Sequence, residues 1–170
     1  EGDAIAEICR QVNGIVSVAN YNCPGQIVIT GESKAVNEAA ERLKEAGARR
    51  CIPLKVSGPF HSMMLKEAGE KLSEVLDTVE VRNFEIPYVT NVTADYVKDP
   101  AQVKELLSRQ VYSSVKWQQS VERMIADGID TFVEIGPGKT LTGFLRKIDR
   151  NVKGISVEKA EDLEKLSQLL

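Results

Sequence analysis

The residue best suited to acid–base chemistry in this sequence is His61, the only histidine among 170 residues. It lies within the segment SGPFHSMM, residues 57–64. An imidazole titrates near neutral pH and can accept and return a proton, which makes His61 a candidate general base. A single histidine on a turn can also be purely structural, and His61 taken by itself does not decide between these interpretations.

A change in hydrophobic periodicity places His61 on a turn between a strand and a helix. Ile52, Leu54 and Val56 alternate, which predicts a strand over residues 50–56. Apolar residues then recur at helical spacing and predict a helix over residues 62–79. Because Gly58-Pro59 breaks the strand, the imidazole is expected close to the beginning of that helix.

Three further segments carry polar groups at predicted turns. Residues 20–26, NYNCPGQ, place amides on a hairpin loop, although Asn, Pro and Gly also suit turns for conformational reasons. Residues 109–112, RQVY, end one predicted helix, where a helix cap and connector is the alternative interpretation. Residues 134–140, EIGPGKT, form a strand, a tight turn and a helix start, whose free N–H groups can bind an anion. This segment lacks the glycine spacing of a nucleotide-binding loop.

No convincing nucleophile or carboxylate partner accompanies His61 in the sequence. Cys23 is disfavoured because cysteines are commonly buried and no helix N-terminus is predicted to activate this one. Glu67 and Glu70 follow on the predicted helix and are expected to face water. No G-x-S-x-G nucleophile elbow occurs. A base without a nucleophile cannot perform acyl transfer.

The first part of the chain, residues 1–57, predicts a helix, two strands, a second helix and a third strand. The first helix is capped by Asp3, strands over 15–20 and 26–30 pair as a hairpin, and Ser33 caps the second helix. One additional strand in front would complete a βαββαβ or ferredoxin-like unit. We therefore expect a ferredoxin-like small subdomain whose first strand lies upstream of Glu1.

The second part, residues 58–170, alternates helices and strands in the manner of an open α/β sheet. After the helix that follows His61, the predicted elements are a strand over 86–92, helices over 99–109 and 115–126, a strand over 131–135, a helix over 141–148, a strand over 154–157 and a closing helix over 163–169. The only candidate boundary between the two parts is the change of pattern at about residues 57–60.

Composition excludes several classes of function. Apolar residues make up 42% and charged residues 28%, values typical of soluble globular proteins, and a net charge of −3 argues against nucleic acid and membrane surfaces as partners. No signal peptide or membrane-spanning apolar run is present. Three cysteines without C-x-x-C spacing favour free thiols in a reducing cytoplasm, and a single histidine argues against a transition-metal site.

Four segments taken together resemble a known family. They are NYNCPGQIVITG, SGPFHSMM, RQVYSSVKW and VEIGPGKTLTG, and in this order they resemble the C-terminal part of bacterial malonyl-CoA:acyl carrier protein transacylases over essentially all 170 residues. The resemblance implies that residues 58–170 belong to an α/β-hydrolase-like large subdomain. It also implies ping-pong transfer of malonyl in fatty-acid synthesis, from coenzyme A to a serine and then to the phosphopantetheine thiol of acyl carrier protein. No metal or bound cofactor is implied.

The resemblance assigns expected roles to five residues. His61 matches the catalytic histidine, and Gln110 matches a residue whose main-chain carbonyl orients the imidazole, where a protease would use an aspartate. Phe60 is expected to form a wall of the acyl pocket, since an aromatic residue before the histidine accompanies malonyl selection in related polyketide acyltransferases. Asn20 and Asn22 are expected to line the same cleft.

The sequence also departs from the family. The serine elbow, the arginine that pairs with the malonyl carboxylate and the glutamine motif of the oxyanion hole are not found, and we expect them upstream of Glu1. The chain would then supply only the histidine half of the site and be inactive alone. Two alternatives are an acyltransferase domain of a polyketide synthase, against which the closing helix argues, and a non-catalytic module that binds carrier protein.

Overall fold

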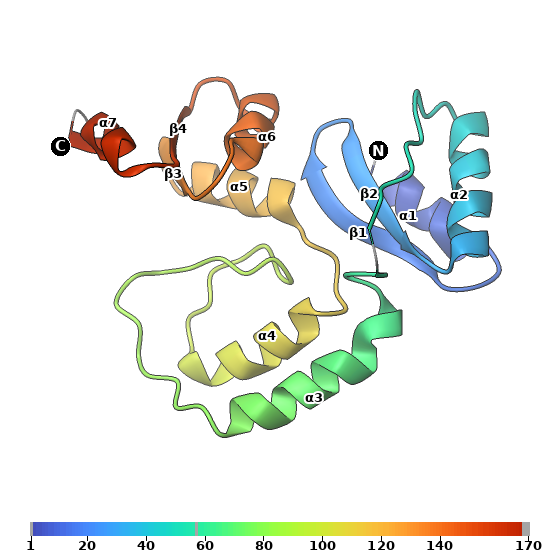
Figure 1. The fold of residues 1–170 in the computed structure, drawn as a ribbon, viewed down its shortest axis with the longest axis horizontal. Helices are drawn as coiled ribbons and strands as arrows, with labels where there is room; N and C mark the ends of the chain where they lie inside the picture. The colour runs from blue at the N-terminus through green and yellow to red at the C-terminus, as the bar shows by residue number, and fades with distance from the viewer. Residues whose placement is uncertain (1, 57, 168–170) are drawn as a thin grey trace.

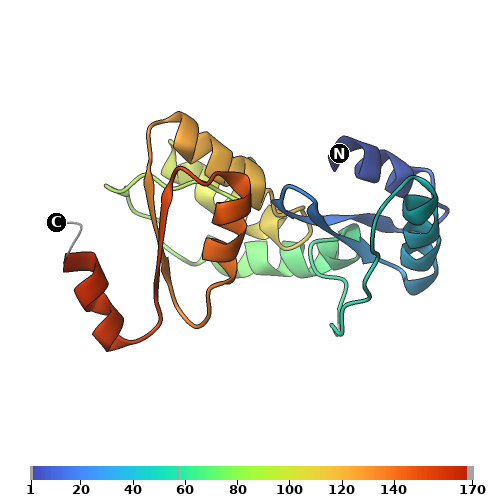
Figure 2. The same cartoon turned by 90° about the horizontal axis from the view of Figure 1, so that it is seen from above.

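The protein is described by a computed structural model that covers residues 2–56 and 58–167. Its elements form three groups, shown in Figure 1, with the N-terminus and the C-terminus at opposite ends of the molecule. The view from above in Figure 2 shows the same separation of the two ends. The molecule is a mixed α/β structure with a small antiparallel sheet near one end and a small parallel sheet near the other.

The first group consists of α1 (Gly2–Arg10), β1 (Val16–Cys23), β2 (Gln26–Gly31) and α2 (Ser33–Glu45). Apolar side chains of both helices and of the strands share one buried core, namely Cys9, Val12, Val16, Ala35 and Ala39. The predicted hairpin is confirmed, because β1 and β2 pair antiparallel with Cys23 opposite Gln26. The two-residue loop between them ends at Gly25, whose φ of +76° suits a residue without a side chain.

The two predicted helix caps in this group were wrong. Asp3 lies inside the first turn of α1, and Ser33 is the first residue of α2 instead of its cap. Glu32 occupies the cap position of α2, but its carboxylate accepts a hydrogen bond from the Ile15 N–H at 3.0 Å. A side chain that could cap its own helix is here used to join the helix start to the beginning of the hairpin.

The predicted strand over residues 50–56 does not form. The segment is without regular structure, and Ile52, Leu54 and Val56 are 69%, 58% and 65% exposed. Alternating residues specify which face of a strand is apolar, but a strand also needs a neighbour for its backbone hydrogen bonds. No described residue pairs with this segment in a strand ladder, which is why the periodicity alone was misleading.

The second group is a pair of helices joined by a long loop. It contains a 3₁₀ turn, η1 (Met63–Leu65), then α3 (Lys66–Asp77), a second 3₁₀ turn, η2 (Pro100–Gln102), and α4 (Val103–Gln110). The two α-helices lie side by side in both views. A Cβ on Gly69 would lie 2.7 Å from the Ser108 carbonyl oxygen, so glycine permits this close packing.

The strand predicted over residues 86–92 in the long loop is also wrong. This segment forms only an isolated bridge between Val89 and Tyr96. The loop is nevertheless anchored, because Val92 and Val97 are buried together with Leu106 of α4. Apolar residues that suggested a strand therefore serve as packing contacts for a helix.

The third group contains α5 (Trp117–Ala126), β3 (Thr131–Ile135), α6 (Thr140–Ile148), β4 (Lys153–Val157), η3 (Ala160–Leu163) and α7 (Glu164–Ser167). Strands β3 and β4 are parallel, with Thr131 opposite Lys153 and Ile135 opposite Val157. The bounds predicted for β3 are confirmed, whereas the end predicted for the closing helix lies outside the described residues. Helices α5 and α6 both contact β1, which joins this group to the hairpin.

The described part of the chain shows neither a membrane-spanning helix nor a cluster of metal ligands. None of its helices combines the length and the apolar character needed to cross a membrane. Within residues 2–56 and 58–167, no three His, Cys, Asp or Glu side chains gather as metal ligands would.

Candidate active site

His61 lies on the turn that precedes η1, close to the beginning of a helix as expected, although no strand of the described residues leads into this turn. Its backbone is left-handed with a φ of +58°. Only a few per cent of residues other than glycine adopt this conformation, and it costs energy that the surroundings must supply. The ring Nδ1 lies 3.0 Å from the Gln110 carbonyl oxygen. A carbonyl only accepts hydrogen bonds, so the neutral ring carries its proton on Nδ1. The lone pair is then on Nε2, the atom that a general base would use.

Ser62 holds this unusual turn in place, and sequence reasoning missed it. Its side chain is completely buried, its hydroxyl donates to the Pro59 carbonyl at 2.8 Å, and it accepts from the Met64 N–H at 3.3 Å. One hydroxyl therefore ties together the residues on both sides of His61. The available signal was a serine just before a helix, which is a common capping pattern.

Gln110 is the last residue of α4 and contributes two groups to the site. Its main-chain carbonyl is one of those that the last helical turn leaves without an intrahelical partner, and the His61 ring satisfies it. Its side-chain Oε1 accepts a hydrogen bond from Asn91 Nδ2 at 3.3 Å. The contact expected between the Gln110 carbonyl and the imidazole is present, and Asn91 is a further neighbour that sequence reasoning did not find.

The segment 111–116, which we call the connector, links α4 to α5 and brings strand β1 to the same region. The Val115 N–H donates to the Ala19 carbonyl at 2.7 Å, and the Tyr21 N–H donates to the Val115 carbonyl at 2.9 Å. The backbone of Asn20 is thereby paired with Val115 of the connector. The residue just before the connector, Gln110, contacts His61. The interpretation of RQVY as a helix end and connector is confirmed.

The remaining predicted site residues are less closely joined. Phe60 precedes His61 and is 56% exposed, so it is not a core residue of the described structure. Asn22 lies two residues beyond Asn20 on β1, and among the described residues neither side chain makes a hydrogen bond. Two surface hollows of about 400 and 390 Å³ lie beside α4, and none of the five predicted residues lines either of them.

The alternatives to His61 chemistry within the sequence are not supported. Cys23 is completely buried, and burial raises the pKa of its thiol, which leaves it unreactive. Glu67 and Glu70 face water as predicted, with side chains 78% and 62% exposed, and they pair with Lys71 and Lys66 on the same helix.

The helix start at residues 134–140 is filled by the protein itself. The Glu134 carboxylate accepts hydrogen bonds from the N–H groups of Leu141 and Thr142 at 3.0 and 2.7 Å, and from the Thr142 hydroxyl at 2.6 Å. Burial raises the pKa of Glu134, but these bonds and one from the Thr140 N–H outweigh burial and leave the pKa below its ordinary value. The N–H groups that could have held a bound anion are therefore occupied by an ionised carboxylate.

Comparison with known proteins identifies the family of the chain. Residues 2–163 match the family model described as the acyl transferase domain, so the chain belongs to the acyl transferase domain family. It is 45% identical over its whole length to a malonyl CoA-acyl carrier protein transacylase of Bacillus subtilis, of which it covers 55%. The chain thus spans about half the length of the curated relatives it matches.

Solved structures lead to the same family. A crystal structure of MCAT from Streptococcus pneumoniae superposes with a TM-score of 0.94 at 44% identity, over 99% of this chain and 56% of that one. A structure of a type II PKS acyl-carrier protein in complex with its malonyl-transacylase is 35% identical, with a TM-score of 0.95, over 100% of this chain and 56% of that one. These likenesses agree with the expectation drawn from the four sequence segments.

Proposed function

We propose that this chain supplies the histidine half of the active site of a malonyl-CoA:acyl carrier protein transacylase. The observation that carries the proposal is the hydrogen bond between His61 Nδ1 and the Gln110 carbonyl, in a chain of the acyl transferase domain family. This bond fixes the ring and its tautomer without a carboxylate partner. The free Nε2 can then exchange a proton with a nucleophile brought by another part of the protein.

The proposed reaction has two half-reactions. Nε2 of His61 accepts the proton of a serine outside these residues while that serine attacks the thioester carbonyl of malonyl-CoA. The imidazolium then protonates the departing thiol of coenzyme A, which leaves a malonyl-serine ester. In the second half-reaction His61 accepts the proton of the phosphopantetheine thiol as it attacks the ester, and returns it to the serine. The proton balance closes without a metal or bound cofactor.

The same proposal gives the chain two structural parts. Residues 1–57 form a ferredoxin-like small subdomain, and residues 58–170 form part of an α/β-hydrolase-like subdomain. The hairpin with its two helices and the unpaired residues 51–56 support the first assignment, since an additional strand beside them would complete the sheet. The parallel pair of β3 and β4 supports the second.

Within the proposed site, Phe60 is a wall of the acyl pocket, and Asn20 and Asn22 line the cleft. The exposure of Phe60 beside His61 supports its role, because an aromatic ring open to one side can contact an acyl group. The pairing of Asn20 with the connector supports a place near the reacting centre. We assign the protein to the cytoplasm, where fatty-acid synthesis would supply malonyl-CoA and acyl carrier protein.

A second candidate is the same transfer within polyketide synthesis. The observation that favours it is the likeness to the malonyl-transacylase solved with a type II PKS acyl-carrier protein. The reaction and the roles of His61 and Gln110 are identical in the two cases. Only the carrier protein that accepts malonyl distinguishes them.

The proposal is tested by assaying the complete protein that contains this segment. Purified protein should move malonyl from coenzyme A to the thiol of acyl carrier protein, which is followed by the mass of the carrier. Transfer only to a polyketide carrier would establish the second candidate. Binding of carrier protein without any acyl transfer would make the protein a non-catalytic module and overturn the proposal. The 170 residues by themselves should show no transfer, because they contain no nucleophile elbow.

A further inference from the structure

Asn91 is hydrogen-bonded to the residue before the connector and to the last residue of the connector. Its side-chain Nδ2 donates to Gln110 Oε1 at 3.3 Å, and its main-chain carbonyl accepts from the Lys116 N–H at 3.0 Å. Gln110 is the residue immediately before the connector, and Lys116 is its last residue and the cap of α5. One asparagine therefore spans the segment that leads away from the His61 contact.

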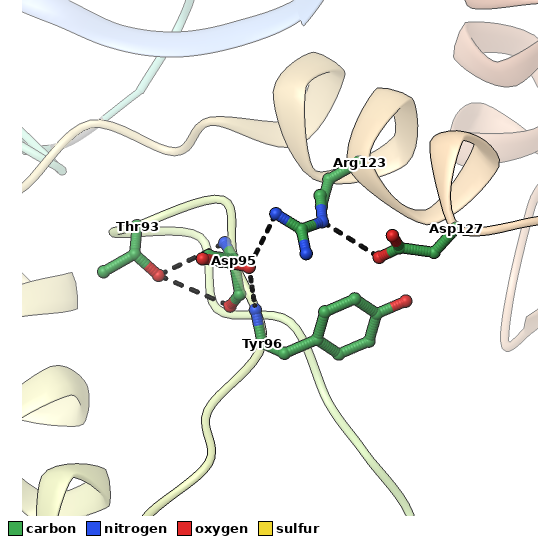
Figure 3. Close-up of polar contacts among 5 residues, drawn as sticks. All are labelled: Thr93, Asp95, Tyr96, Arg123 and Asp127. Atoms are coloured by element: carbon green, nitrogen blue, oxygen red, sulfur yellow. Dashed lines mark hydrogen bonds and ion pairs between the residues drawn. The ribbon is translucent and has the colours of Figure 1, made fainter.

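The turn that carries Asn91 is held in place from two sides. On one side Val92 is buried with Leu106 of α4. On the other side, shown in Figure 3, the Asp95 carboxylate lies 3.3 Å from the Arg123 guanidinium of α5, and that guanidinium lies 5.7 Å from the centre of the Tyr96 ring. Because α4 and α5 both hold the turn, the Asn91 side chain starts from a fixed backbone position.

The Gln110 carbonyl needs such support. It belongs to the final residue of α4, beyond which the helical hydrogen-bond pattern gives way to i to i+3 bonds, such as that from the Tyr112 N–H to the Arg109 carbonyl at 3.2 Å. The direction of the carbonyl depends on the peptide plane at this irregular helix end. A second attachment through the Gln110 side chain restricts the rotation of that plane.

We infer that Asn91 is a positioning residue for His61. By holding the Gln110 side chain and the far end of the connector, it keeps the Gln110 carbonyl directed at Nδ1 of the imidazole. This inference rests on the proposed function, because it assigns Asn91 a role in proton transfer by His61. Among the described residues, Asn91 makes no hydrogen bond to the His61 ring.

Kinetic consequences follow from this indirect role. The orientation of the imidazole matters when the proton moves and contributes little to binding the thioester, so its loss should lower kcat with KM unchanged. The loss of one supporting hydrogen bond should correspond to about a three- to tenfold decrease in kcat. A residue that acted only on the stability of the fold would leave kcat per acylatable active site unchanged.

The test compares three variants in the complete protein, with kcat expressed per acylatable serine. Asn91→Leu keeps the size of the side chain but cannot form the hydrogen bond, and should lower kcat about three- to tenfold. Asn91→Asp should stay within about twofold of the unchanged protein, because the Gln110 amide can rotate and donate its N–H to the carboxylate. Lys98→Ala removes an exposed side chain from the same loop and should leave kcat unchanged.

The double variant Asn91→Leu with Gln110→Ala should lose no more activity than the more damaged single variant, because both changes remove one interaction. Multiplying losses would show that Asn91 acts independently of Gln110 and would overturn the inference. An unchanged kcat in Asn91→Leu, or an Asn91→Asp variant as slow as Asn91→Leu, would overturn it as well. His61→Ala in the same assay separates the two proposals, because full activity there would reject the proposed function itself.

Discussion

Two helix ends in this molecule satisfy their free backbone groups in different ways. At the beginning of α6, the Glu134 carboxylate accepts hydrogen bonds from the N–H groups of Leu141 and Thr142 and from the Thr142 hydroxyl. At the end of α4, the Gln110 carbonyl is bound by Nδ1 of His61. Both arrangements join a helix end to a side chain distant in sequence, and both leave the helix end satisfied.

The two sites differ in how many hydrogen-bonding atoms each side chain keeps free for a ligand. Glu134 uses both carboxylate oxygens within the protein, so its helix end is closed to ligands. An imidazole has two nitrogens, and the bond to Gln110 engages only one of them. A side chain can therefore take part in a reaction only if it keeps a donor or acceptor atom that no other group of the protein occupies. Within the described part of the chain, His61 keeps such an atom, and Glu134 does not.

The largest effect on malonyl transfer is expected from His61→Ala, beside the end of α4. In the complete protein, malonyl transfer should fall by about 10²- to 10⁴-fold, the usual contribution of a positioned acid/base. The thermal midpoint should change little, since His61 is only half-buried. Stopped-flow or mass-based transfer assays at neutral pH give the measurement. A variant that retains most of its transfer rate would remove His61 from the mechanism.

The next largest effect is expected on the choice of acyl group, through Phe60 beside His61. If the Phe60 ring occupies the space that a branch methyl requires, Phe60→Ser should raise the methylmalonyl-to-malonyl ratio of kcat/KM by about 10- to 200-fold. Competition between the two thioesters measures this ratio. Val75→Ser, which removes an exposed apolar side chain in a different place, on α3, serves as the control and should leave the ratio unchanged. An unaltered ratio together with lower stability would assign Phe60 to packing.

A smaller effect separates the backbone of Gln110 from its side chain. Gln110→Ala keeps the carbonyl and should cost less than about tenfold in kcat, or about 1.4 kcal/mol. Gln110→Pro should cost at least about tenfold more, since proline removes a helical N–H and displaces the backbone that carries the carbonyl. Rates per acylatable site, together with thermal melting, distinguish misdirection from unfolding. Equally severe losses in both variants would show that the amide takes a direct part.

The smallest effect on transfer is expected from a change of Glu134, beside the beginning of α6. Glu134→Gln should lower the free energy of unfolding by about 1–2 kcal/mol, a value discounted for the partial exposure of the group, and change transfer by less than about twofold. Denaturant unfolding at neutral pH measures the first quantity. Glu85→Gln, a change at an exposed loop glutamate, is the matched control. A large loss of transfer at unchanged stability would give Glu134 a role in the site.

The stabilisation by Glu134 should also depend on pH. Its pKa is lower in the folded protein than its ordinary value of 4.5, so its contribution is present above that pH and is lost as the pH falls through the folded value. The unchanged protein and Glu134→Gln should therefore differ in stability at pH 7 and approach each other as the pH falls below 4.5. A constant difference across this range would exclude the ionised carboxylate as the cause.

Local sequence determined much of the architecture. Apolar spacing and glycines located α2, α5, α6 and β3 because helices and their ends depend on neighbours within a few residues. The hairpin at Pro24-Gly25 could be predicted for the same reason. Residues 50–56 and 86–92 were mistaken for strands because strand formation needs a partner from elsewhere in the chain.

In the candidate site too, some residues could be predicted from the sequence and others became evident only in the folded structure. The sequence by itself drew attention to His61, and its resemblance to a family suggested the Gln110 carbonyl as a partner. Only the tertiary structure brought Asn91 to the Gln110 side chain and placed Glu134 over the start of α6. These contacts join residues 19 and 7 positions apart through the packing of separate elements, and no local spacing rule encodes such distances. The physical reason is that hydrogen-bond partners across elements are set by how the elements pack.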